Sequence, residues 1–117
     1  MLLWTLAGSN RITAVRDLIL SEETEIFVST ASWWEIVIKT SIGKLQADIK
    51  VLRSAASRSG ISDLPVLGLH METLAALPML HRDPFDRLIV AQAITEPMKF
   101  LTSDAQLAAY TDLVQLV

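Results

Sequence analysis

The chain contains no cysteine among its 117 residues. This absence excludes a disulfide scaffold, a thiolate zinc site and a cysteine nucleophile, and it fits a reducing cytoplasm. An excess of positive charge is also lacking, because the formal net charge is −3. Any contact with nucleic acid would therefore need a local basic patch. No apolar run approaches the roughly 20 residues that cross a bilayer, and the N-terminus does not resemble a signal peptide. We expect a cytoplasmic protein without a membrane segment.

Apolar residues are abundant, at 51% of the chain. That share is enough for one packed core and argues against disorder, which goes with low hydrophobicity and high net charge. The sequence has no repeat, no low-complexity segment and no break in composition. We therefore expect a single domain over residues 1–117.

Short apolar runs alternate with helical patterns along the chain. Leu2, Leu3 and Leu6 are typical of the end of an apolar element, closed by a turn at 7–10. Strands are predicted at 25–29, 63–67, 98–102 and 113–117. Helices are predicted at 12–20, 32–43, 47–57, 70–77 and 83–96, with a short one after Asp104. This alternation predicts an α/β fold with a short parallel sheet flanked by helices.

Three acidic residues stand at predicted helix starts, and each has an ordinary structural explanation. Glu35 follows Ser32 at the spacing of a capping box. Asp86 follows Asp83-Pro84, a natural N-cap and first helical residue, where a carboxylate suits the helix dipole. Asp104 follows a strand and could simply cap the next helix. On spacing alone, capping is the simpler interpretation of each acid.

The same three acids also suit a metal site. In a parallel α/β sheet, ligands bind beyond the carboxyl ends of the strands, and Glu35 and Asp104 both follow strand ends. Mg²⁺ and Mn²⁺ prefer carboxylate oxygens, water and substrate phosphate as ligands. Glu35, Asp86 and Asp104 are therefore the candidate catalytic and metal-binding residues.

Several other side chains near these acids could contact a substrate or be merely structural. Four basic residues could form a phosphate-binding rim or be solvated side chains: Lys39, Lys44, Arg82 and Arg87. Trp33 and Trp34 could stack on bases, although packing in a core or interface is the simpler interpretation. His70 is expected at a helix start or on the surface, and His81 could contact a phosphate or an acid.

These residues also carry a resemblance to a known family. The stretch 32–39, followed by Gly43-Lys44-Leu45, resembles the second acidic motif of PIN-domain toxins of the VapC type. The stretch 81–93 closely resembles their third motif, and 101–104 resembles their fourth. The stretch 2–8 resembles the segment that follows their first motif. The resemblance covers essentially the whole chain, and the third motif is its most specific part.

The resemblance implies a PIN-like three-layer domain with a short parallel sheet flanked by helices. It implies a ribonuclease toxin of a type II toxin–antitoxin system, dependent on Mg²⁺ or Mn²⁺ and inhibited by a cognate antitoxin. Such toxins cleave RNA and commonly form homodimers. By motif match, Glu35, Asp86 and Asp104 would form the acidic site, whereas Asp83 would be the cap.

The beginning of the chain departs from the family pattern. In the relatives, an apolar strand ending in an aspartate precedes the segment matched by 2–8, and here Met1 stands at that place. The first strand and first aspartate are therefore expected to be missing, which would expose the pairing edges of neighbouring strands. A recorded start that is too late, or a truncated protein, would explain this.

Two other functional interpretations remain open. A catalytically inactive, truncated PIN domain would act only as an antitoxin- or RNA-binding protein. In a purely structural interpretation, all three acids are caps, and substituting each would change stability by about 1 kcal/mol without affecting any activity.

Overall fold

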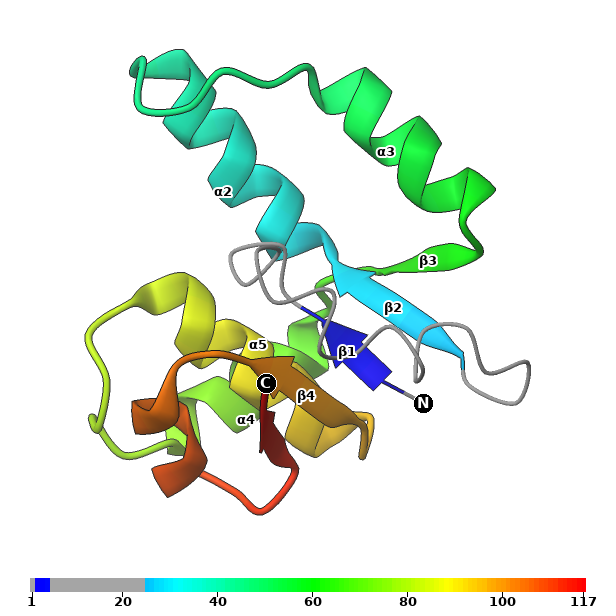
Figure 1. Ribbon diagram of the computed structural model, residues 1–117. Coiled ribbons are helices and arrows are strands. Elements are labelled where there is room, and N and C mark those ends of the chain that lie inside the picture. Colours follow the sequence, from blue (N-terminus) through cyan, green and yellow to red (C-terminus); the bar gives the residue numbers. More distant parts are fainter. Residues whose placement is uncertain (1, 5–24) are drawn as a thin grey trace.

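The computed structural model describes residues 2–4 and 25–117. These residues contain a five-stranded sheet in the order β3-β2-β1-β4-β5, in which every neighbouring pair is parallel (Figure 1). The strands are β1 (Leu2–Trp4), β2 (Ile26–Ser29), β3 (Ile61–Leu64), β4 (Lys99–Thr102) and β5 (Val114–Leu116). The predicted turn at 7–10 and helix at 12–20 lie outside the described residues.

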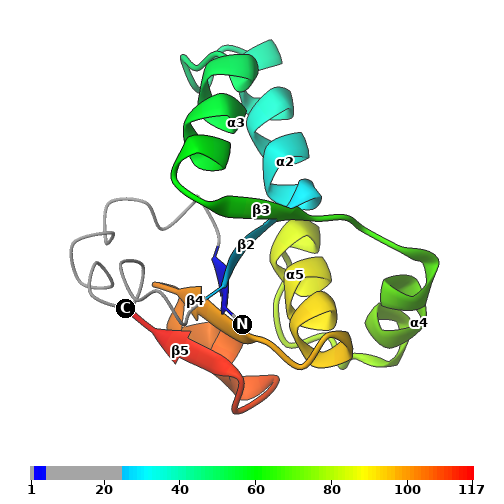
Figure 2. The same ribbon diagram turned by 90° about the vertical axis from the view of Figure 1, so that its right-hand side faces the viewer.

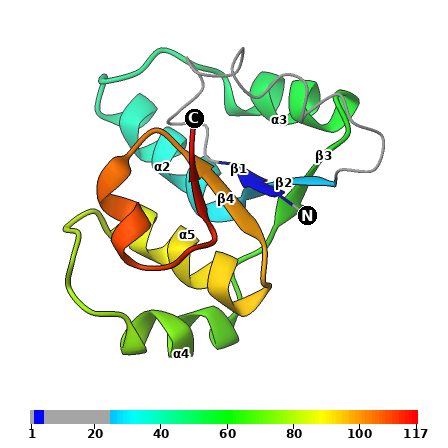
Figure 3. The same cartoon turned by 60° about the horizontal axis from the view of Figure 1, so that its bottom comes forward.

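Helices cover both faces of this sheet, which gives the three-layer PIN-like arrangement. The described helices are α2 (Thr30–Ser41), α3 (Ile49–Arg58), α4 (Gly68–Ala76), α5 (Pro84–Thr95) and the short 3-10 helix η2 (Ala105–Ala109). Seen along the sheet, α2 and α3 lie on one side of β3, and α4 and α5 lie on the other (Figure 2). On its own side, α4 packs on the outside of α5 (Figure 3).

Alternation along the strands divides the core between the two faces. Ile26 and Val28 pack with Trp33 of α2 on one face. Phe100, from the central part of the sheet, packs with Ile89 of α5 on the other. Successive strand residues point to opposite faces, so a buried strand needs apolar side chains throughout. The predicted fold class is confirmed.

The start of α2 lies earlier than predicted, and this overturns one interpretation of Glu35. Ser29, the last residue of β2, is the N-cap, and its Oγ accepts a hydrogen bond from the backbone N–H of Ala31 at 3.1 Å. The strand thus passes into the helix without a loop. Ser32 lies inside the first turn, so Glu35 is not at the N3 position and the capping-box interpretation is wrong.

The position of β1 corrects the expectation that the edges of its neighbouring strands are exposed. Residues Leu2–Trp4 lie between β2 and β4, with Leu2 opposite both Ile26 and Lys99. The edges that were expected to be exposed are therefore paired. β1 pairs with residues 26–27 of β2 on one side and with residues 99–101 of β4 on the other. This central strand has the sequence Leu-Leu-Trp and contributes no carboxylate.

Other elements differ from the sequence prediction only at their ends. β3 begins two residues earlier than predicted, and α4 also begins two residues earlier. Gly43 and Gly60 follow α2 and α3 with φ near 80°, a conformation that suits glycine after a helix end. Within the described ranges, none of the helices has the length and apolar character required to span a membrane.

Candidate metal centre

The parallel topology brings acidic residues from three elements to the carboxyl end of the sheet. α2 leaves β2 directly and carries Glu35 in its second turn. Asp104 follows β4, which lies beside β1 on the side away from β2. α5 begins beside them with Asp83 and Asp86 in its first turn. Strand order therefore explains why acids far apart in the sequence lie at one edge.

Asp83 acts as the N-cap of α5, as predicted. Its Oδ1 accepts hydrogen bonds from the backbone N–H groups of Phe85 at 2.9 Å and Asp86 at 3.3 Å. Pro84 occupies the first helical position, where its lack of an N–H has no cost. Capping involves only the backbone N–H of Asp86. Among the described residues, the carboxylate of Asp86 has no hydrogen-bond partner.

Asp104 combines a capping role with a contact across the site. Its Oδ1 accepts a hydrogen bond from the backbone N–H of Gln106 at 2.9 Å, which caps η2 as predicted. Its Oδ2 lies 2.8 Å from Nε2 of His81, a side chain that is only 12% exposed. One of the two contacts considered for His81, that with an acid, is thus present.

Asp86, Asp104 and His81 form a compact group. Each offers one potential ligand atom, and these atoms lie within 4.8 Å of one another. Glu35 lies outside this group and forms an ion pair with Lys39 of the next helical turn, at 3.3 Å. The side chain of Glu35 is 13% exposed, and its negative charge raises the pKa of Asp86.

The environment of Asp86 is electrostatically unfavourable for a carboxylate. Burial raises its pKa to about 6. The negative charges of Asp83, of Glu35 and, least of the three, of Asp104 add to this, whereas His81 acts in the opposite direction. Like charges and desolvation both favour the neutral acid. A cation at this position would remove the penalty, and carboxylate oxygens are the ligands that Mg²⁺ and Mn²⁺ prefer. The donor set therefore fits such an ion.

The four predicted substrate-binding cations have different environments. Lys39 is half exposed beside Glu35, and Arg82 is exposed directly before the cap of α5. Lys44 is exposed beyond the far end of α2. Arg87 is held inside the protein, where its guanidinium donates to the backbone carbonyl of Leu77 at 3.3 Å. Among the four, Lys39 and Arg82 are both exposed and lie within four residues of one of the acids.

The two tryptophans of α2 have separate roles. Trp33 is buried in the core and donates its indole N–H to Asp63 at 2.8 Å. Trp34 is 59% exposed and meets the ring of Phe85 edge to face, with the ring centroids 5.2 Å apart. Packing is therefore confirmed for Trp33, whereas Trp34 remains accessible.

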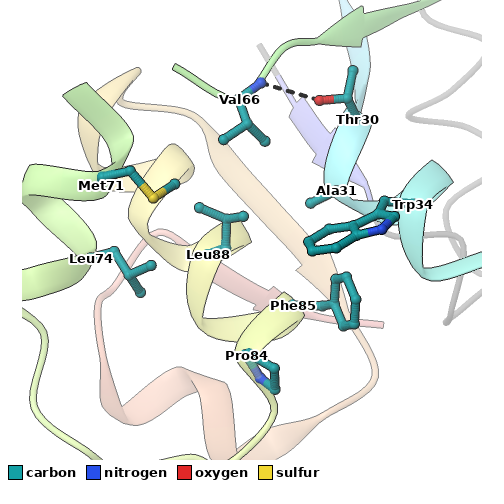
Figure 4. Close-up of a pocket in the computed structure, with 9 residues that line it drawn as sticks. All are labelled: Thr30, Ala31, Trp34, Val66, Met71, Leu74, Pro84, Phe85 and Leu88. Carbon is teal, nitrogen blue, oxygen red and sulfur yellow. Dashed lines mark hydrogen bonds between the residues drawn. The ribbon is translucent and has the colours of Figure 1, made fainter. Parts of the chain in front are cut away.

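An apolar pocket is lined in part by residues that neighbour two of the acids in the sequence. It has a volume of about 460 Å³ and lies between α2, α4 and α5 (Figure 4). Trp34 and Phe85 line it at one side, and Met71 and Leu74 of α4 face them. Trp34 precedes Glu35 and Phe85 precedes Asp86, so α2 and α5 each contribute one residue to the pocket and one to the acids.

The sequence analysis named His81 as a side chain that could contact a phosphate or an acid, but it did not point to Tyr110. The Tyr110 hydroxyl accepts hydrogen bonds from the backbone N–H groups of Leu80 and His81, at 3.0 and 2.9 Å. These contacts join segments about 30 residues apart, which no local pattern reveals. His70, by contrast, is at the predicted helix start but is fully buried, so the surface alternative is wrong.

The charge on Asp86 should cost folding stability in the metal-free protein. Above pH 6 the Asp86 carboxylate is ionised in both the folded and the unfolded protein. The folded protein then carries the full free-energy cost of the buried charge. Asp86→Asn should therefore raise the free energy of unfolding at pH 7 by about 1–2 kcal/mol, less than the full equivalent of its pKa shift because the group is partly exposed. The gain should vanish near pH 4, where the folded wild type is already protonated. Urea unfolding at both pH values in the presence of EDTA measures this.

Asp83→Ala is the matched control on the same helix turn. It removes a cap and should destabilise the protein by about 1 kcal/mol at pH 7. A destabilising effect of Asp86→Asn at pH 7 would mean that Asp86, like Asp83, serves as a structural residue.

Comparisons with known proteins agree with this architecture. No curated protein matches the sequence significantly. Among solved structures, that of VapBC2 from Rickettsia felis bound to a DNA fragment from their promoter is similar with a TM-score of 0.73 and 14% identity, covering 99% of this chain and 98% of that one. A structure of FitAB bound to the IR36 DNA fragment has a TM-score of 0.66 and 17% identity, covering 99% and 94%. The family model of the PIN domain matches residues 1–113, and the chain belongs to this family.

Proposed function

We propose that this PIN domain is the toxin of a type II toxin–antitoxin pair and that it hydrolyses RNA phosphodiester bonds with Mg²⁺ or Mn²⁺. The observation that carries the proposal is the environment of Asp86. Its carboxylate is partly buried, lies beside Asp104 and is surrounded by like charges that a bound cation would offset. The VapC-type motifs of the sequence and the VapBC2 and FitAB structures support the class.

In this proposal, the three acids have related roles. Asp86 and Asp104 would bind the cation directly. Glu35, on α2, would bind it directly or through a water molecule. A divalent cation lowers the pKa of a bound water and stabilises the charge on a phosphate under attack. The negative potential of the acids also requires basic side chains to hold the RNA backbone, and Lys39 and Arg82 are placed to do so, with Lys44 and Arg87 as further candidates. Trp34 could stack on a base.

RNA cleavage by the purified chain should require a divalent cation and should stop with EDTA. Asp86→Asn should lower the cleavage rate by more than about 100-fold, beyond the loss expected from removing a partner of a metal ligand. Gel analysis of a structured RNA pool, with and without Mg²⁺ or Mn²⁺, measures this. Asp112→Asn is the control, because it removes one exposed charge outside the acidic group.

Cleavage that EDTA does not affect, or that survives Asp86→Asn, would overturn the proposal.

The second candidate function is a PIN domain that only binds an antitoxin or RNA. It is favoured by the sequence of β1, which lacks a carboxylate at the centre of the sheet. Partner binding without any metal-dependent cleavage would establish it instead.

The proposed partner is an antitoxin, in a homodimeric complex in the cytoplasm. The apolar pocket between α2, α4 and α5 and the exposure of Trp34 support a protein-binding surface there, since exposed apolar patches commonly mark such surfaces. A bound antitoxin segment at this place would also cover the acidic group. Light scattering of the chain alone tests the dimer, which would have twice the 12.9 kDa mass.

Trp34→Ala should weaken binding of the cognate antitoxin by about 10-fold or more, because a large aromatic side chain often dominates an interface. Calorimetric titration measures the affinity. Val51→Ala is the control: Val51 is equally exposed, at 59%, but lies on α3. Equal affinities for both variants would exclude the pocket as the docking surface.

A further inference from the structure

His81 is held by hydrogen bonds at both nitrogens of its ring. Nδ1 accepts a hydrogen bond from the backbone N–H of Asp83 at 3.1 Å. Nε2 lies 2.8 Å from Oδ2 of Asp104. The ring therefore spans the gap between the cap of α5 and the cap of η2, and it contacts both within hydrogen-bonding distance.

These two contacts determine which nitrogen carries the proton. A backbone N–H can only donate, so Nδ1 must offer its lone pair to Asp83. In the neutral ring the proton is then on Nε2, and Nε2 donates to the carboxylate of Asp104. A nitrogen that carries a proton has no lone pair for a metal ion. His81 is therefore close enough to Asp86 and Asp104 to be a third ligand, but in this tautomer it cannot coordinate a metal ion through Nε2.

The backbone around His81 is also held in place. Its N–H and that of Leu80 both donate to the hydroxyl of Tyr110, at the end of η2. Asp104 in turn uses Oδ1 to cap η2. The loop before α5 and the helix after β4 are therefore joined at two points. One is the Tyr110 hydroxyl, and the other is the bond between His81 and Asp104.

We propose that His81 is a positioning residue that donates its Nε2 proton to Asp104 and is not itself a metal ligand. This inference rests on the metal site proposed above. The donated proton fixes the rotation of the Asp104 carboxylate, which offers a ligand atom within 4.8 Å of that of Asp86. Partners that orient the ligands of a metal in this way commonly contribute 10- to 100-fold to its affinity.

Two variants isolate the donated proton. His81→Gln retains an N–H donor near the position of Nε2, whereas His81→Leu has none. Both lose the ring nitrogen that accepts from Asp83, so that defect is common to them. Mn²⁺ binding, followed by electron paramagnetic resonance of the free ion, should be 10- to 100-fold weaker in His81→Leu and within about 3-fold of wild type in His81→Gln. Thermal unfolding of the metal-free variants checks that both are folded.

Equal affinity of wild type and His81→Leu, or equal weakening by both variants, would overturn the positioning role. If the wild type itself bound no Mn²⁺, the proposed metal site would fail and this role with it. Nuclear magnetic resonance of the ¹⁵N-labelled histidine distinguishes the cases. We expect the Nε2–H form in the metal-free protein and after addition of Mg²⁺. Loss of the Nε2 proton on Mg²⁺ addition would make His81 a ligand and contradict the inference.

Discussion

The burial of one carboxylate among others at the end of the sheet is the constraint on which this site depends. Burial raises the pKa of Asp86, and the negative charges of Asp83, Glu35 and Asp104 raise it further. A protein interior does not tolerate such a charge without compensation. The positive end of the α5 dipole acts in the opposite direction. A divalent cation is the compensation that the ligand chemistry favours.

The fold holds this unfavourable group together with bonds that do not involve the cation. Asp83 and Asp104 each cap a helix, so two of the acids are held by backbone N–H groups. Tyr110 fixes the loop that carries His81. The direct passage from β2 into α2 fixes the position of Glu35 relative to the sheet. Capping and metal binding are therefore compatible, and the capping interpretation does not count against the site.

Local chemistry made much of the fold predictable from the sequence. Asp83-Pro84 marks the start of α5, and the apolar run after it predicts the buried helix. Asp104 was recognised as a cap for the same reason. The start of α2 was not predictable in this way, because its cap, Ser29, is also the last residue of a strand. Local patterns assign such a residue to one element only.

The candidate site was predictable in its members but not in its geometry. The motif resemblance selected Glu35, Asp86 and Asp104, yet spacing alone could not show that Glu35 stands apart from the other two. The contact between His81 and Asp104 joins residues 23 positions apart and depends on the packing of two loops. The pairing of β1 between β2 and β4 is likewise a property of the whole sheet, which three residues cannot reveal.

The most direct test of the metal centre is a crystal structure of the protein with Mn²⁺, using the anomalous scattering of the ion. We expect one peak beyond the carboxyl end of the sheet, with oxygens of Asp86 and Asp104 at about 2.1–2.2 Å, a little longer than Mg²⁺ distances. Glu35 should face the ion, directly or through water. Absence of a peak at these acids under saturating Mn²⁺ would contradict the account.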